Sequence, residues 1–497
     1  MPADRALVVG AGVGGLSTAI YLALEGYHVT VFESNDSCGG RANLLEFEGF
    51  RFDTGPSLLN YPWVFDEMFR AAGSSLRQEL QLNRVDPAIK FFWPDGETFQ
   101  VSSDLTRLAS ECRRLDSGDT AGLFSFLHDA RNKFSLSFDR LVSRNANSPL
   151  SWFAAAGLTN LPRLGLLRSM DSEIGRHFKN KRIRDAFGSY GMYLGGAPTD
   201  LPGIFSIIPF GEIEYGLWLP KGGMYSLIQA MQGTAERLGV EIVTGCPVKN
   251  IDTDSDRVTG ITLQDGSFEP SQVVVSNVDV PTTMTRLVGA SDIKRYRAPQ
   301  MTPGVLTYYL AVNRELPELG HHSVFLPDDP GHAYRQLMKK GIIPDDLPFY
   351  VSVASNTDPG MAPKGKSAVF ILVPVPLVSQ TTHVNWQDES ARLLERVQAR
   401  LTVHRITIAD SDIIQQQTMT PIDWSDQFGL YDGSAFGASH NLRQIGPFRP
   451  KNFSPRFKGL FFTGASTTPG TGVPMCVLSG KMAADRVVKW LRKEMVA

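Results

Sequence analysis

The sequence has little of what identifies several common classes of protein. Its 497 residues include only four cysteines, which are scattered and form no C-x-x-C pair, so neither a disulfide framework nor a cysteine metal site is expected. A net charge of −2 provides no basic stripe for nucleic acid. No run of 18 apolar residues exists, so no membrane-spanning helix is predicted.

Two catalytic signatures are also missing. The nine histidines include the adjacent pair His321 and His322, but no H-E-x-x-H pattern, and no G-x-S-x-G elbow occurs. We therefore predict no metal site and no serine hydrolase. The content of 42% hydrophobic and 20% charged residues is typical of a globular protein, and the length exceeds what one ordinary core contains.

The N-terminal residues do carry a clear pattern. In order, they contain an apolar run at Ala6–Val9, the glycines Gly10, Gly12 and Gly15, a helical spacing that stops at Gly26, and a second apolar run at Val29–Phe32. Glu33 stands at the end of the second run, about twenty residues past the glycines. This arrangement of strand, G-x-G-x-x-G turn, helix, strand and acid matches the dinucleotide-binding fingerprint.

Each part of the fingerprint has a physical task. Gly10 permits the tight turn, Gly12 lets the backbone approach a pyrophosphate, and Gly15 lets helix and strand pack closely. The helix N-terminus offers N–H groups and a positive dipole end to the phosphates. Glu33 can accept hydrogen bonds from ribose hydroxyls. Because the first strand begins almost at the first residue, we expect no cleavable leader before it.

Only one such fingerprint is present. An enzyme that passes electrons from NADPH through a flavin would usually carry a second one in mid-sequence. We therefore expect one tightly held cofactor, and an electron donor or acceptor other than NAD(P)H.

The rest of the chain alternates between strand-like and helical patterns. A hairpin is predicted at 89–101 and mostly helix from about 104 to 200. Further predicted elements are a helix at Met224–Leu238, strands at Glu241–Thr244, Val273–Val275, 302–312, 349–355 and 368–374, and a final strand, glycine-rich loop and helix. Within the helical part, residues 148–170 mix apolar side chains with Arg163 and Arg168. We interpret them as a core helix pair broken at Pro162, with an interfacial membrane segment as the alternative.

Several segments together resemble the FAD-containing amine oxidase and phytoene desaturase superfamily. The matching parts are the fingerprint with Glu33, Gly39-Gly40-Arg41, and Gly464-x-x-x-x-Pro469-Gly470 with the closing helix. The carotenoid branch is the better match, through GFRFDTGPSLL (49–59), GLWLPKGGMYSLIQAM (216–231), PDDLPFYVSVASNTDPGMAPKG (344–365) and TGASTTPGTGVPM (463–475). The loop here reads T-T-P-G where many desaturases have T-H-P-G, and its V-P-M ending is similar to relatives that oxidise a terminal methyl group.

The resemblance implies an α/β fold: a Rossmann-type FAD-binding domain with a substrate domain, a mixed sheet plus a helical cap, inserted between its segments. The implied FAD-binding segments are 1–103, 222–290 and 445–497, and the implied substrate segments are 104–221 and 291–444. The cofactor-binding residues implied are Gly10, Gly12, Gly14, Gly15, Glu33, Gly40, Arg41, Val248, Gly464, Ala465, Gly472, Val473, Pro474 and Met475. The helix N-terminus at Val473–Met475 suits negative charge on a reduced flavin.

The resemblance also implies a long apolar polyene as substrate, bound in an apolar tunnel. Side chains that we expect to line it are Phe205, Ile207, Ile208, Phe210, Leu217 and Trp218, with plain core packing as the alternative for each. The candidates for acid–base work are Arg41, Asp53 and Glu212, although a turn-capping role is favoured for Asp53.

We expect an FAD-dependent desaturase of an acyclic C30 or C40 carotenoid precursor, with oxygen or a quinone as electron acceptor. The alternatives are oxidation of a terminal methyl to an aldehyde, and redox tailoring or cyclisation of another polyene natural product. An amine or porphyrinogen oxidase is disfavoured, because no aromatic pair accompanies the C-terminal loop. A more distant alternative is a non-enzymatic prenyl-lipid-binding module. The expected location is cytoplasmic, with peripheral contact to a membrane.

Overall fold

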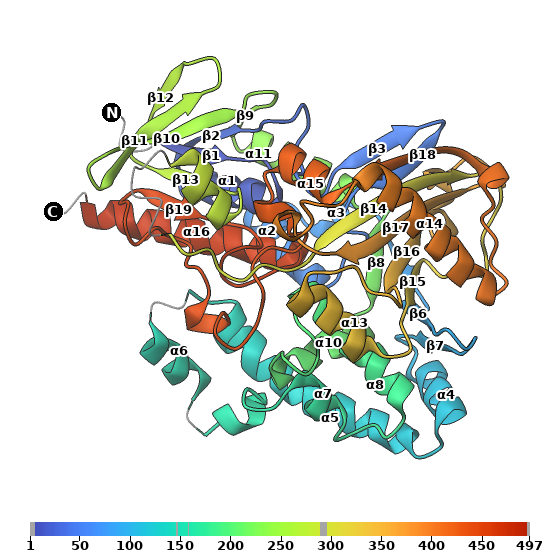
Figure 1. The fold of residues 1–497 in the computed structure, drawn as a ribbon. Coiled ribbons are helices and arrows are strands. Elements are labelled where there is room, and N and C mark those ends of the chain that lie inside the picture. Colours follow the sequence, from blue (N-terminus) through green and yellow to red (C-terminus); the bar gives the residue numbers. More distant parts are fainter. Residues whose placement is uncertain (1–4, 146–147, 158, 289–295, 495–497) are drawn as a thin grey trace.

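The computed structural model of the protein describes residues 5–145, 148–157, 159–288 and 296–494. The ends of four expected domain ranges, at 1–4, 289–295 and 495–497, lie outside the described residues. Figure 1 shows a parallel sheet with its helices on one side of the molecule, a larger mixed sheet on the other, and a layer of helices below both. The expected α/β fold with a mixed sheet and a helical cap is confirmed.

The parallel sheet gathers strands from three distant parts of the chain. Its order is β19 (Leu460–Phe462), β13 (Val274–Ser276), β1 (Arg5–Val9), β2 (His28–Phe32) and β9 (Glu241–Val243). Each neighbouring pair is parallel. Such strands are buried on both faces, which agrees with their continuous apolar runs. The strands predicted at Ala6–Val9, Val29–Phe32 and Glu241–Thr244 are therefore confirmed to within a residue or two.

Helices α1 (Val13–Leu24), α11 (Tyr225–Arg237) and α16 (Val473–Glu494) pack beside this sheet (Figure 1). Helices α1 and α16 approach closely, because a Cβ on Gly480 would lie 2.5 Å from Cβ of Ser17. The Ser17 hydroxyl donates to the carbonyl of Val477 at 2.8 Å. The last helix of the described chain is thus fixed against the first.

Beside the parallel sheet lies a small antiparallel one. It consists of β10 (Val248–Asp254), β11 (Arg257–Leu263) and β12 (Phe268–Pro270). Its apolar face joins the parallel sheet in one cluster of buried side chains, which includes Val9, Ile261 and Leu460.

The larger sheet has seven strands. Their order is β18 (Ile413–Met419), β14 (Gly304–Val312), β17 (Ser367–Val375), β16 (Phe349–Val353), β15 (His322–Phe325), β6 (Ile89–Phe92) and β7 (Thr98–Val101). The hairpin predicted at 89–101 is present, but it belongs to this sheet rather than to the FAD-binding part that we expected to extend to residue 103. The cause is the parallel pairing of β6 with β15, which begins more than 200 residues later.

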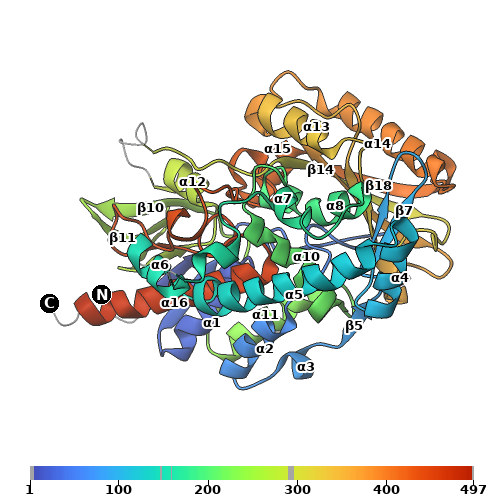
Figure 2. The ribbon, with the colours of Figure 1, turned by 90° about the horizontal axis from the view of Figure 1, so that it is seen from below.

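The helical layer crosses under both sheets (Figure 2). Its elements are α4 (Leu105–Leu115), α5 (Asp119–Ser137), α6 (Pro149–Ala156), α7 (Met170–Ile174), α8 (Lys181–Gly188), α9 (Gly191–Leu194) and α10 (Ile207–Tyr215). The mostly helical character predicted for 104–200 is confirmed. In the segment 148–170, the predicted helix pair is one short helix, α6, followed by a 3-10 turn at Leu161–Leu164.

Shorter elements connect these layers. They are β3 (Leu44–Phe47) with β4 (Phe50–Asp53), β5 (Leu82–Val85) with β8 (Leu217–Pro220), and the helices α2 (Pro62–Ala71), α3 (Leu76–Glu79), α12 (Val280–Thr282), α13 (Pro330–Tyr334), α14 (Trp386–Val403) and α15 (Pro421–Phe428). Among the described residues, no helix is both long enough and apolar enough to cross a bilayer.

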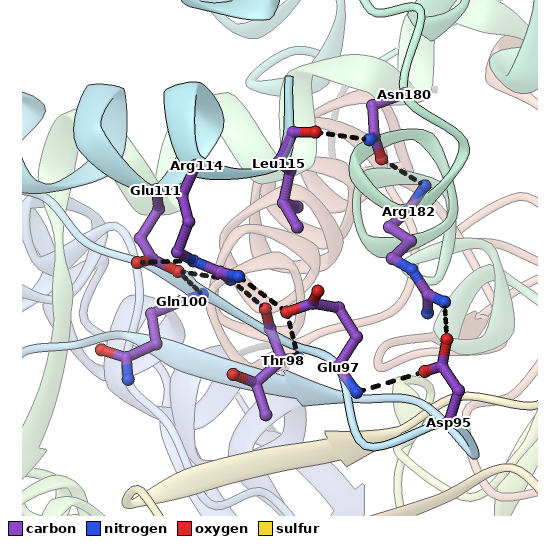
Figure 3. Close-up of polar contacts among 9 residues, drawn as sticks. All are labelled: Asp95, Glu97, Thr98, Gln100, Glu111, Arg114, Leu115, Asn180 and Arg182. Carbon is purple, nitrogen blue, oxygen red and sulfur yellow. Dashed lines mark hydrogen bonds and ion pairs between the residues drawn. The ribbon is translucent and has the colours of Figure 1, made fainter. Parts of the chain in front are cut away.

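Polar contacts attach the helical layer to the seven-stranded sheet, as Figure 3 shows. Arg114, near the end of α4, donates to Glu97 at 2.7 Å and also binds the carbonyl of Thr98. Arg182 on α8 pairs with Asp95 in the hairpin turn. These side chains are partly exposed, so they orient the two layers more than they stabilise them.

Candidate functional site

The glycine turn after β1 has the geometry that a bound pyrophosphate requires. A Cβ on Gly15 would lie 2.0 Å from the carbonyl oxygen of Gly10, so helix and turn are in direct contact. Helix α1 begins without a side-chain cap and without an acidic residue in its first turn. Its first N–H groups are therefore free to bind an anion, which the positive end of the helix dipole also favours.

Glu33 lies at the carboxyl end of β2 and faces this turn. One carboxylate oxygen accepts from the N–H of Ala11 at 2.7 Å, and the other accepts from the N–H of Asn35 at 3.0 Å. The side chain is only 4% exposed. A carboxylate fixed in this way beside the glycines fits the ribose of a dinucleotide, since the oxygen that accepts from Ala11 retains acceptor capacity.

Asn277 is a site residue that the sequence reasoning missed. It follows β13, and its amide lies where a Cβ on Gly12 or Gly14 would be, at 2.5 Å and 2.6 Å respectively. Gly12 and Gly14 thus make room for this side chain as well as for a phosphate. Its position directly after a buried strand could have indicated it. The carboxyl ends of parallel strands meet at one edge of the sheet, where ligands bind.

The turn at Gly39–Arg41 touches the fingerprint. The N–H of Gly39 donates to the carbonyl of Ala11 at 2.9 Å, and Gly40 has φ of +56°. A Cβ on Gly40 would lie 3.6 Å from Cα of Gly12. Arg41 donates to the carbonyl of Ala435 at 2.8 Å and has Asp279 as its ion partner at 3.9 Å. The two glycine turns are therefore parts of one site.

The C-terminal loop also reaches the fingerprint. The Thr463 hydroxyl lies 3.4 Å from the carbonyl of Gly14, and the N–H of Gly464 donates to the Ser479 hydroxyl at 3.1 Å. Ala465 is buried, and Gly472 precedes the first turn of α16, which contains Val473, Pro474 and Met475. The two ends of the chain meet at one place, as a single cofactor site requires.

Val248 lies at the start of β10, close to Glu33 along the same edge. The Cys246 N–H donates to the carbonyl of Glu33 at 2.8 Å, and Val248 packs in the apolar cluster beside Val243. Direct contacts thus connect the glycine turn after β1 with Glu33, the Gly39–Gly40 turn and the start of the C-terminal loop, and Glu33 with the segment before β10. Their donors, glycines and single carboxylate fit FAD.

Of the three catalytic candidates, Asp53 has a structural task. Its carboxylate accepts from the N–H groups of Met224 and Tyr225, at 2.8 Å and 3.0 Å, and so caps the start of α11. Burial raises the pKa of Asp53 to about 6, although the two N–H groups oppose this shift. Asp53 therefore does not cap its own turn, as the sequence favoured, but the start of a helix 171 positions later.

Glu212 on α10 is the candidate whose carboxyl group has no cation as a partner among the described residues. It is 3% exposed and accepts a hydrogen bond from the Tyr190 hydroxyl, while no ion pair to it is found in the described part of the chain. Burial raises the pKa of Glu212 to about 7, against the opposing effect of this hydrogen bond. A carboxyl group with such a pKa exchanges a proton near neutral pH.

The expected tunnel residues fall into two groups. Phe210 and Leu217 are buried in the main apolar core, and Trp218 belongs to β8, which pairs with β5. Phe205, Ile207 and Ile208 are only partly buried, and the ring of Phe205 meets the edge of His440 at 5.6 Å. His440 is next to Gly470 in the cofactor loop, so this second group connects the loop to the helical layer.

The histidine pair is not a metal site. His321 bonds to Thr357 and His322 to Tyr350, whose hydroxyl also contacts Ser57. No cluster of metal-ligating side chains occurs among the residues that the structure describes. Burial lowers the pKa of both imidazoles, so both are neutral.

Comparisons with known proteins agree with this geometry. The family model described as flavin containing amine oxidoreductase matches residues 13–488. The chain is 36% identical to a zeta-carotene-forming phytoene desaturase of Myxococcus xanthus, over 99% of this chain and 95% of that one. It is 31% identical to a 4,4'-diapolycopene oxygenase of a Methylomonas species, over 98% of each. An oxidoreductase from Methanosarcina mazei has a similar fold, with a TM-score of 0.63 and 18% identity over 98% of this chain and 100% of that one.

Proposed function

Since the chain belongs to the flavin containing amine oxidoreductase family and is an FAD-dependent oxidoreductase, we propose that it desaturates an acyclic carotenoid precursor of the C30 or C40 class. The observation that carries this proposal is the 36% identity to a phytoene desaturase over 99% of the chain, which includes both glycine loops of the site. Bound FAD supplies a two-electron acceptor for the hydrogen removed from an allylic carbon.

The protein's own residues have three tasks in this proposal. Gly10, Gly12, Gly14 and Gly15 hold the pyrophosphate, Glu33 the adenosine ribose, and the backbone at Val248 the adenine. Gly40, Arg41 and the loop from Gly464 to Met475 hold the flavin end. Phe205, Ile207 and Ile208 exclude water beside it, and Glu212 accepts the proton. The segments up to residue 88, with 222–290 and 445–497, then form the cofactor half.

A test combines product analysis with a matched pair of glycine variants. The wild type, expressed in cells that make C30 or C40 polyenes, is expected to extend their conjugation, which chromatography and absorption spectra measure. Gly15→Ala should abolish bound flavin and product, because its Cβ would meet the carbonyl of Gly10. Gly233→Ala, in the middle of α11 with only Arg237 within 4 Å, should leave both unchanged. Unchanged polyenes with the flavin-loaded wild type would refute the proposal.

Oxidation of a terminal methyl group is the second candidate, supported by the 31% identity to a diapolycopene oxygenase. The same experiment separates the two: an aldehyde on an already conjugated polyene indicates terminal oxidation, and added double bonds indicate desaturation. The electrons leave to oxygen or to a quinone, since the sequence has no second nucleotide fingerprint. Reoxidation of the reduced flavin by each acceptor in turn decides between them.

We also propose peripheral contact with a membrane around α6. Leu150 is 83% and Leu167 is 95% exposed, while Trp152 packs against Gly446 and brings the half-exposed Phe448 to the same region. Arg163 and Arg168 supply positive charge for anionic lipid. Flotation with anionic vesicles should carry the wild type upward and leave a Leu150→Ser, Leu167→Ser variant behind. Phe268→Ser, which changes a 49% exposed residue on β12, should still float; equal flotation of all three proteins would refute the contact.

A further inference from the structure

The segment at Arg449–Asn452 supports the C-terminal glycine loop from below. Pro450 accepts hydrogen bonds at its carbonyl from the Thr467 hydroxyl, at 2.8 Å, and from the N–H of Thr468, at 3.1 Å. The amide of Asn452 donates to the carbonyl of Thr468 at 2.9 Å. Two consecutive loop residues, Thr467 and Thr468, are thus held by a segment 16 to 18 positions earlier in the chain.

Arg449 makes the strongest of these connections. Its guanidinium donates four hydrogen bonds to the carbonyl oxygens of Ala438, Ser439, Ala465 and Thr467, at 3.0, 3.2, 2.7 and 2.7 Å. Two of these acceptors lie in the loop and two lie in the strand-like segment before His440. The planar fork of arginine suits such a bridge, since its donors have a fixed geometry.

The charge of Arg449 is not cancelled. The residue is 2% exposed, and within the described residues no carboxylate forms an ion pair with it. Carbonyl dipoles solvate the cation but leave its full charge in place, whereas buried cations in proteins are usually paired with an acid. Burial lowers the pKa of Arg449 to about 9, so the guanidinium remains charged at neutral pH.

His440 holds the other end of the loop. Its Nε2 accepts from the N–H of Thr471 at 3.3 Å, and the same atom would lie 2.5 Å from a Cβ on Gly470. Burial, followed by the charge of Arg449, lowers the pKa of His440 well below its usual value, so the ring is neutral and can accept this bond. The loop is therefore fixed at Ala465, Thr467 and Thr471 by protein contacts alone.

We propose that Arg449 is a positioning residue that fixes the cofactor loop at 464–471, and that its unpaired charge stabilises the anionic, reduced form of the bound flavin. The inference rests on the assignment of this loop to the flavin under the proposed function. Fixed positive charge in a water-excluded site interacts strongly with a nearby anion, because little solvent screens it. Reduction adds negative charge to the flavin, so the cation favours that state.

Two variants separate the bridge from the charge. Arg449→Lys keeps the cation but lacks the planar fork, so it should release FAD at least fivefold faster while the ratio of reduced to oxidised flavin changes less than twofold. Arg449→Met removes the charge as well, so this ratio should fall about tenfold at a fixed potential, or ~30 mV for a two-electron couple. Equilibration with a reference dye measures the ratio, and dilution with a fluorescent readout measures release. Arg443→Met, on the exposed turn just before, is the control and should match the wild type.

The two roles of Arg449, its charge and its hydrogen-bonded bridge, can each be refuted separately. A flavin ratio in Arg449→Met equal to that of the wild type would overturn the role of the charge, as would a tenfold change in Arg449→Lys. Unchanged FAD release from Arg449→Lys would overturn the bridge. If Arg449→Met does not fold, the lysine variant decides alone, and if neither folds, Arg449 serves general stability and the proposal is wrong. A wild type that binds FAD without acting on any polyene refutes the proposed function and leaves this inference standing.

Discussion

Two buried cations in this protein, Lys133 and Arg449, have different kinds of partner. Lys133 on α5 is 2% exposed and is paired with two acids: with Glu173 on α7 at 2.7 Å, and with Asp129 one turn earlier. Arg449 is equally buried, but all its acceptors are neutral carbonyls of the cofactor loop and its neighbour. The helical layer cancels its buried charge, while the cofactor half leaves one uncancelled.

The difference separates stability from function. An internally paired charge has no remaining field to act on a ligand, and its removal harms only the fold. An unpaired buried charge lowers stability, so we expect one only where its electric field acts on a bound ligand or a reacting group. Glu212, a buried carboxylate without a cation, is the negative counterpart of Arg449. Glu212 lies on α10 and Lys133 on α5, both in the helical layer, so these groups differ in their partners rather than in the layer that contains them.

The largest effect is expected at Lys133. Lys133→Met leaves Glu173 and Asp129 without their shared cation, so the free energy of unfolding should fall by about 3–5 kcal/mol. Thermal unfolding of the FAD-loaded protein measures the change. Lys481→Met, which removes an exposed partner of Asp485 on α16, should cost less than about 1 kcal/mol. Equal melting temperatures of the two variants would mean that the buried ion pairs of Lys133 do not stabilise the fold, which would contradict the difference between Lys133 and Arg449.

The unpaired carboxyl group of Glu212 should make the free energy of unfolding depend on pH. Because its pKa is raised to about 7 in the folded protein, the folded state holds a proton between the ordinary glutamate value and about pH 7 that the unfolded state has lost. The free energy of unfolding should therefore fall as pH rises through this window, by roughly 3 kcal/mol in total.

Glu212→Gln should remove this pH dependence and be more stable than the wild type at pH 8. If Glu212 accepts the substrate's proton, turnover of the wild type should rise with pH through about 7, and that of the glutamine variant should be low at every pH. Melting curves and product formation at pH 5 to 8 measure both. A pH dependence of stability between pH 6 and 8 that survives in the variant would assign it to another group, since the raised pKa of Asp53, about 6, affects stability mainly below that range.

Glu33 tests whether the cofactor half depends on specific acceptors as well as on charge. Glu33→Ala removes the ribose acceptor and frees the N–H of Ala11, so the dissociation constant of FAD should rise about 10- to 100-fold, equivalent to about 1.5–3 kcal/mol. Titration of the apoprotein with FAD measures it. Glu25→Ala, an exposed acid on the same βαβ unit, is the control. Equal flavin content in both variants and the wild type would contradict the ribose assignment.

The smallest effect is expected in the exposed network of Figure 3. The Arg114 side chain is 41% exposed. Because exposed ion pairs contribute little to stability, Arg114→Ala should lower the free energy of unfolding by less than about 1 kcal/mol. The same melting experiment measures it. A loss as large as that of Lys133→Met would mean that exposure does not distinguish the two kinds of pair.

The parts of the site that follow local rules were predictable from the sequence. Gly10, Gly15 and Glu33 belong to one short unit whose spacing has a direct physical cause, and the structure has each in its expected place. The hairpin at 89–101 was also correct as an element. Periodicity and turn chemistry carry this information, because neighbours in sequence determine it.

The remaining parts depend on contacts between distant segments. Asp53 caps a helix that begins at residue 225, the hairpin at 89–101 takes its sheet from β15, and Asn277 lies against the glycine turn that follows β1. Arg449 bonds carbonyls 10 to 18 positions away, on both sides of it in the sequence. A lone arginine in F-R-P-K shows no period and no motif that would reveal four buried carbonyls around it. Such residues are found only when the tertiary structure brings their partners together.

The order of strands in the parallel sheet has a consequence for biosynthesis. Strand β1 leaves the ribosome before its neighbours β13 and β19, which follow about 270 and 450 residues later. With synthesis at about 5–20 residues per second, the glycine turn waits many seconds for the partners that complete it. The complete cofactor site therefore forms only after β19 has been synthesised, and the apolar strand β1 lacks these partners until then.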